Sequence, residues 1–147
     1  MKNLIAALLA VSVCTTATAW AQDDPGLEAI KARQEIMSFF GSNMRTLKAI
    51  MEGRSEFDAD YVQGAGREIG AKAEELELLF PEGSEEGLNT KAKPSVFENK
   101  IGFQQELDDL KNGAAAIAVA ETQIEFNAAF LSFSRTCGSC HGQFRSN

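Results

Sequence analysis

Two cysteines and a histidine near the end of the chain have a spacing that predicts specific chemistry. Cys137, Cys140 and His141 form a C-x-x-C-H motif. This spacing is typical of covalent haem attachment, in which each thiol forms a thioether with a vinyl group and the histidine binds the iron. Residues three and four apart share one face of a helix, so both sulfurs and the imidazole would project together. His141 is the only histidine of the chain, which leaves no second imidazole for the iron or for proton transfer.

Three other uses of these cysteines fit the sequence less well. A thioredoxin-like dithiol shares the C-x-x-C spacing but lies where a strand enters a helix, and no segment here alternates like a strand. A zinc site would lack a fourth ligand at a recognised spacing. A disulfide across three residues of one helix would close almost no loop and would stabilise little. The motif therefore predicts one covalent haem c with its iron.

The helices that must position this motif are visible as apolar residues recurring every three or four positions. They predict an all-α fold, an antiparallel four-helix bundle with covalently bound haem. Cap residues, prolines and glycines mark where the expected elements begin and end. The first helix covers 25–52 and starts at Asp24 and Pro25, and the second is capped by Asp58 and ends before Pro81. A long connection over 80–94 leads to a third helix opened by a capping box at Ser95, and a fourth helix is opened by a capping box at Thr122. The end of the third helix is left open, because Gly113 interrupts its pattern.

The first predicted helix carries two features that bear on a haem. Arg33 interrupts its apolar stripe, and a buried guanidinium is costly unless it is paired, so we expect Arg33 either to bind a haem propionate or to extend to solvent. Met37, Met44 and Met51 lie on the same stripe and could supply a thioether to the iron or fill the core. Their positions alone do not choose among them.

The start of the chain predicts export. Lys2, the apolar run from Leu4 to Val13 and the small residues up to Ala21 match a signal peptide over 1–21, cleaved near Ala21, with a haem domain over 22–147 in the periplasm. The apolar run is too short to span a membrane. With a net charge of −7, 44% hydrophobic and 24% charged residues, the chain is globular and is not expected to bind nucleic acid. Its acidity instead predicts partners with a basic docking face.

The chain resembles the class II c-type cytochromes, the cytochrome c-prime family. The resemblance is carried by the haem motif followed by Arg145, by the segment from Arg33 to Met37, and by the segments 79–81 and 91–94. It implies a four-helix bundle in which Arg33 and Gln34 lie near the propionates, Arg145 lies near the proximal histidine, and Met37 faces the distal side of the haem. Members with methionine at this place look like low-spin carriers, and many relatives form homodimers.

Together these observations predict a periplasmic cytochrome that carries single electrons, with His141 and Met37 as the axial ligands. We expect no catalytic turnover, because no distal histidine is present to move protons. The expected partners are soluble or membrane redox proteins, with a homodimer as a further assembly. The alternative is a five-coordinate haem that binds nitric oxide or carbon monoxide, in which Met37 leaves the distal site open.

Overall fold

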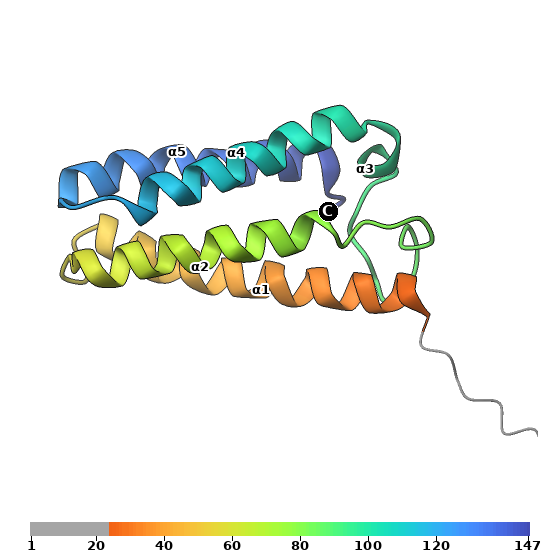
Figure 1. Cartoon of the computed structure of the whole chain (residues 1–147), viewed down its shortest axis with the longest axis horizontal. Coiled ribbons are helices and arrows are strands. Elements are labelled where there is room, and N and C mark those ends of the chain that lie inside the picture. Colours follow the sequence, from red (N-terminus) through yellow and green to blue (C-terminus); the bar gives the residue numbers. More distant parts are fainter. Residues whose placement is uncertain (1–23) are drawn as a thin grey trace, which may run out of the picture.

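The fold was taken from a computed structural model, which describes residues 24–147. The predicted signal peptide lies outside these residues. The described chain contains five helices: α1 (Pro25–Met51), α2 (Ala59–Glu77), α3 (Ser95–Glu98), α4 (Lys100–Ala118) and α5 (Gln123–Phe144). In Figure 1, α1 and α2 form one layer, α4 and α5 form the other, and the short α3 lies at the end of the molecule where the connection crosses. Successive long helices run in opposite directions, so the predicted antiparallel four-helix bundle is confirmed.

The predicted helix starts follow from side chains that satisfy free backbone N–H groups. The Asp24 carboxylate accepts from the N–H of Gly26 at 2.8 Å, and Pro25 takes the first position of α1. Asp58 caps α2 in the same way. Thr122 and Glu125 form a complete capping box at the start of α5. These caps confirm the predicted starts of the first, second and fourth helices.

The predicted start of the third long helix is wrong. Ser95 opens only the four residues of α3, and the chain then breaks at Asn99 (φ −109°, ψ 62°). The Asn99 side chain accepts from the N–H of Gly102 at 3.1 Å and so caps α4. The Ser95 hydroxyl donates instead to the carbonyl of Gln143 at 3.1 Å. A tertiary contact with α5 therefore replaces the capping box that the local sequence predicts.

Two glycines allow α4 to lie close to its neighbours. A Cβ on Gly113 would lie 3.0 Å from the Phe133 ring, and one on Gly66 would lie 2.5 Å from the backbone nitrogen of Ala118. Gly113 therefore does not interrupt the helix, which continues past it to Ala118. At both places the missing side chain lets α4 pack against α5 and α2.

The buried side chains form one core between the two layers. Its largest members come from all four long helices: Ile36, Phe40, Leu47, Ile50, Val62, Ile69, Leu76, Leu107, Leu110, Ile117, Phe126, Phe130 and Phe133. The inner face of α1 differs from the predicted stripe, because Ile36 is buried whereas Met37, which was placed on that stripe, is 36% exposed. No helix of the described part is long and apolar enough to cross a membrane.

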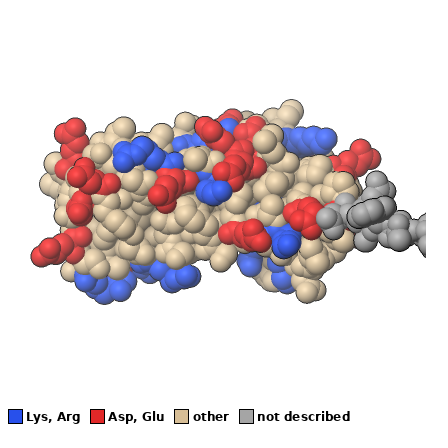
Figure 2. All heavy atoms as spheres, turned by 60° about the horizontal axis from the view of Figure 1, so that its bottom comes forward, with Lys and Arg blue, Asp and Glu red and all other residues tan. Residues whose placement is uncertain are grey.

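Charges are mixed on the surface seen from the side of α1. Figure 2 shows acidic and basic side chains interspersed on this face. The negative charge of the chain is therefore not gathered on this face into a region of a single sign.

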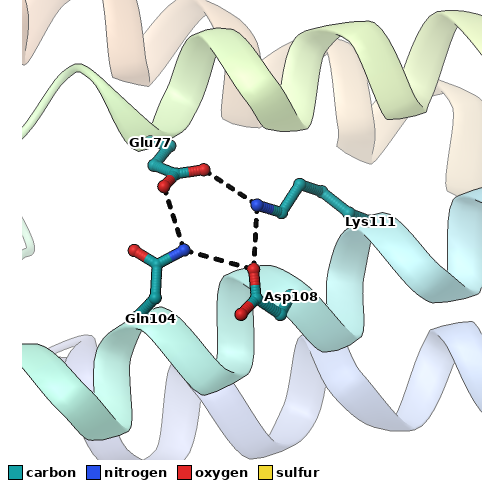
Figure 3. A network of polar contacts seen from close by, with 4 residues as sticks. All are labelled: Glu77, Gln104, Asp108 and Lys111. Carbon is teal, nitrogen blue, oxygen red and sulfur yellow. Dashed lines mark hydrogen bonds and ion pairs between the residues drawn. The ribbon is translucent and has the colours of Figure 1, made fainter.

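A polar network joins α2 to α4 beside the core. Lys111 lies 2.8 Å from carboxylate oxygens of both Glu77 and Asp108, and the Gln104 amide donates to the same two residues at 3.0 and 3.2 Å (Figure 3). The ammonium group of Lys111 lowers the pKa of both carboxyl groups, which in turn raise the pKa of Lys111. The network fixes α2 against α4 next to Leu76, where the two helices border the cavity described below.

Candidate haem-binding site

A cavity of about 540 Å³ opens between the helices near the end where α5 finishes. This volume lies within the range of about 300–1,000 Å³ that is usual for cofactor and ligand sites. All seven residues predicted from the sequence line it: Arg33, Gln34, Met37, Cys137, Cys140, His141 and Arg145. The fold thus brings together side chains that are separated by about a hundred positions in the chain.

The two cysteines reach the cavity from the second half of α5. Both are half-buried free thiols, so the structure contains no disulfide between them. Burial raises the pKa of Cys137, and burial together with the Glu106 carboxylate raises the pKa of Cys140 to about 11. Among residues 24–147 no group of three histidine, cysteine or acidic side chains could hold a metal ion. Both thiols therefore stand as free groups at the wall of the cavity.

His141 lies at the edge of the cavity, one turn beyond Cys137. Partial burial lowers the pKa of its imidazole, and the positive charge of Arg145 lowers it further. Both effects favour the neutral imidazole, which is the form that binds iron. Arg145 therefore lies within electrostatic reach of His141.

Arg33 is buried, with 4% of its surface exposed, but its partners come from the protein. Its guanidinium donates to the carbonyl and hydroxyl oxygens of Ser84 at 2.6 and 3.0 Å, to the carbonyl of Leu79 at 3.2 Å and to the hydroxyl of Thr90 at 2.7 Å. It also lies 4.8 Å from the centre of the Phe80 ring. The predicted extension to solvent is wrong, and the pairing with a propionate stays a prediction. In the structure, the hydrogen bonds of Arg33 hold the connection between α2 and α3 in place.

Gln34 and the methionines differ in how they meet the cavity. The Gln34 amide donates to the carbonyl of Leu88 at 2.9 Å, which ties it to the same connection as Arg33. Met37 and Met44 both line the cavity, whereas Met51 is packed against the core farther along α1. The structure therefore removes Met51 from the three methionines that the sequence left open.

The connection itself forms part of the cavity wall, which the sequence did not reveal. Thr90, Lys91 and Ala92 line the cavity. They are held there because the backbone N–H of Lys93 donates to the carbonyl of Phe144 at 2.9 Å, and the N–H of Ser146 donates to the carbonyl of Lys91 at 2.8 Å. The sequence did not reveal this, because a loop held by hydrogen bonds between distant backbone groups leaves no periodic pattern of apolar residues.

The residues present fit a haem. Rings and aliphatic side chains form most of the wall, including Phe40, Leu76, Phe80, Val96, Phe103, Leu107, Leu110 and Phe144. Such a wall suits a flat apolar macrocycle. The two thiols match two vinyl groups and the imidazole matches one iron coordination position. Lys91 and Arg145 add positive charge at the same cavity, where the carboxylates of a haem would need partners.

Comparisons with known proteins find similar sequences and structures over most of the chain. A family model described as Cytochrome C' matches residues 28–145. Cytochrome c' of Rhodopseudomonas palustris is 32% identical over 150 residues, covering 99% of this chain and 97% of the relative, and cytochrome c-556 of Agrobacterium tumefaciens is 30% identical over 118 residues, covering 79% and 95%. The crystal structure of cytochrome c' from Thermochromatium tepidum has a TM-score of 0.76 at 29% identity, covering 86% of this chain and all of the other. A nitric oxide complex of a cytochrome c' variant from Alcaligenes xylosoxidans has a TM-score of 0.75 at 21% identity, covering 83% and 97%, and this likeness shows the fold alone.

The comparisons also correct the expected function. The prediction of an electron carrier with His141 and Met37 as axial ligands is wrong, because two relatives that each cover 99% of the chain, and similar solved structures, are cytochromes c'. The prediction rested on a thioether at one position of α1. A methionine beside the cavity is not sufficient for ligation, since two methionines line it and Met37 stays 36% exposed.

Proposed function

This chain belongs to the cytochrome c' family, and on that premise we propose that it is a periplasmic haem protein that binds nitric oxide or carbon monoxide at a five-coordinate iron. Like its family, it carries a covalently attached c-type haem. The observation that carries the proposal is the family match across the bundle. The sequence adds support, because a single histidine cannot provide two imidazole ligands.

The attachment residues each have a separate role. Cys137 and Cys140 hold the haem through thioethers, and His141 binds the iron from α5. When bound, the haem supplies an iron whose remaining coordination position takes a diatomic gas. Burial and, to a smaller extent, the positive charge of Arg145 lower the pKa of His141, and both favour the neutral imidazole that can bind iron. The chain thus contributes covalent retention and one ligand.

The cavity also offers the gas an apolar surface. Phe40 and Met44 reach it from α1, and Leu107 reaches it from α4. None of these side chains donates a hydrogen bond, so water at the iron would be poorly stabilised. Met37, at the same cavity, adjusts the space available to the gas without binding the iron.

Arg33 and Gln34 contribute through the connection that closes the cavity. Arg33 holds Ser84 and Thr90, and Gln34 holds Leu88. Thr90 is itself part of the wall. Both residues therefore shape the end of the cavity at which the haem carboxylates would lie.

The remaining parts of the proposal concern export and assembly. A signal peptide over 1–21 would deliver a haem domain over 22–147 to the periplasm. We propose a second copy of the chain as the partner, as the family resemblance suggests. Redox partners were expected because the sequence predicted an electron carrier, and they are not part of this proposal. No turnover is proposed, because the chain has no second histidine to transfer protons.

Absorption spectra of the holoprotein test the proposal. We expect a high-spin ferrous spectrum that changes on addition of carbon monoxide, and the Met37→Leu variant should keep that resting spectrum. Met51→Leu, which alters a methionine away from the cavity, is the matched control. A low-spin ferrous spectrum that resists carbon monoxide and becomes high-spin only in Met37→Leu would overturn the proposal.

A further inference from the structure

Glu106 of α4 lies against the outside of the haem-attachment turn of α5. One of its carboxylate oxygens accepts a hydrogen bond from the hydroxyl of Ser139 at 2.6 Å and another from the amide of Gln143 at 2.6 Å. Ser139 and Gln143 are four residues apart and so share one face of α5. They flank Cys140 and His141 in the sequence. The Glu106 carboxylate therefore joins, through two hydrogen bonds, the successive turns of α5 that carry Cys140 and His141.

Within the part of the chain that the structure describes, the Glu106 carboxylate has no cationic partner. None of the ion pairs found between residues 24 and 147 includes Glu106. Glu106 nevertheless borders the cavity together with Cys140 and His141, and it also borders a groove on the outer side of α4 and α5. A charge with no ion partner that reaches a largely apolar cavity is screened less than one in water.

We propose that Glu106 is a positioning residue for the haem-attachment turn and that its negative charge lowers the reduction potential of the haem held there. The inference rests on the proposed attachment at Cys137, Cys140 and His141, and it does not depend on gas binding. One-electron reduction removes one unit of positive charge from the iron. A fixed negative charge nearby therefore stabilises the ferric form more than the ferrous form.

Four variants separate the charge of Glu106 from its hydrogen bonds. Glu106→Gln removes the charge and keeps an oxygen acceptor, whereas Glu106→Asp keeps the charge. Ser139→Ala removes one hydrogen bond and leaves the charge in place. Asp109→Asn is the matched control, because Asp109 is an acidic residue of the same helix that borders the outer groove and not the cavity.

The midpoint potential of each holoprotein is measured by titration with a chemical reductant while the absorption spectrum is followed. Glu106→Gln should shift the potential to a more positive value, by clearly more than Asp109→Asn, and Glu106→Asp should restore most of the original value. Ser139→Ala should lower the thermal unfolding temperature with a smaller shift in potential. A shift in Glu106→Gln no larger than that of Asp109→Asn would overturn the inference.

Mass measurement of every variant keeps this result distinct from the proposed function. A wild-type chain with no added haem mass would overturn the attachment site and the inference together. If the wild-type chain carries haem but its midpoint potential does not change when Glu106 is replaced, the inference alone is overturned. Carbon monoxide binding in the same preparations reports separately on the gas-binding proposal.

Discussion

Replacing Arg33 with methionine tests whether a buried guanidinium holds the connection that closes the cavity. Methionine keeps a long side chain in the same place but donates no hydrogen bond. The hydroxyls of Ser84 and Thr90 would keep other partners, since Ser84 also donates to the carbonyl of Pro81 and Thr90 also accepts from the N–H of Ala92. Within residues 24–147, Arg33 is the only side-chain donor to the carbonyls of Leu79 and Ser84, and both would lose it.

The expected loss of stability follows from these two carbonyls. A buried acceptor left without a donor costs about 1–3 kcal/mol. Leu79 is only partly buried, so water can replace part of what its carbonyl loses, and we expect Arg33→Met to lower the free energy of unfolding by about 2–4 kcal/mol. For a domain of this size, each kcal/mol corresponds to about 3–5 °C in the unfolding midpoint. The variant should therefore unfold about 10 °C below the wild type.

Denaturant unfolding followed by circular dichroism gives the change in free energy, and hydrogen exchange of amides 80–94 shows where it acts. Arg45→Met is the matched control, because Arg45 lies exposed on the same helix. The control should remain close to the wild type. If Arg33→Met were as stable as Arg45→Met, with unchanged exchange across the connection, the assigned role of Arg33 would be incorrect.

Three further predictions concern the bundle. Gly66→Ala places a Cβ 2.5 Å from the backbone of α4 and should cost about 1–3 kcal/mol. Gly64→Ala places a Cβ 3.9 Å from the Arg67 guanidinium, an ordinary contact, and should gain up to about 1 kcal/mol. Thermal unfolding of the two variants checks the difference, and equal midpoints would contradict it. Thr122→Ala removes the capping side chain of α5 and should lower the free energy of unfolding by about 1 kcal/mol in denaturant unfolding. An unchanged free energy of unfolding would contradict this. Glu77→Gln breaks the pair with Lys111 and should cost less than about 1 kcal/mol at neutral pH. Because the pKa of Glu77 is lowered in the folded protein, its contribution to stability is present above the ordinary pKa of a glutamate and is lost as the pH falls through the lowered pKa. The unfolding midpoints of Glu77→Gln and of the wild type should therefore converge in acid. A difference between the midpoints that stays constant with pH would refute this.

Several features could be predicted from the sequence because their causes are local. Asp24, Asp58 and Thr122 start helices by bonding to backbone groups two or three residues away, which a short stretch of sequence records. The C-x-x-C-H spacing is likewise local, since a helix places its three side chains on one face. The fold class follows from the apolar period of the same helices. The seven predicted residues that line the cavity came partly from this spacing and partly from a family resemblance.

Other features were decided only by the tertiary structure. Ser95 is a cap in form, but its hydroxyl donates to Gln143, 48 positions away, and α4 starts at Asn99 instead. Arg33 has partners 46 to 57 positions away, so its place on the apolar stripe was visible in the sequence but its burial and its partners were not. Glu106 gave no signal at all until α4 was packed against α5. Hydrogen bonds between distant side chains depend on how the helices are rotated and offset, and that is fixed by the packing of the whole core.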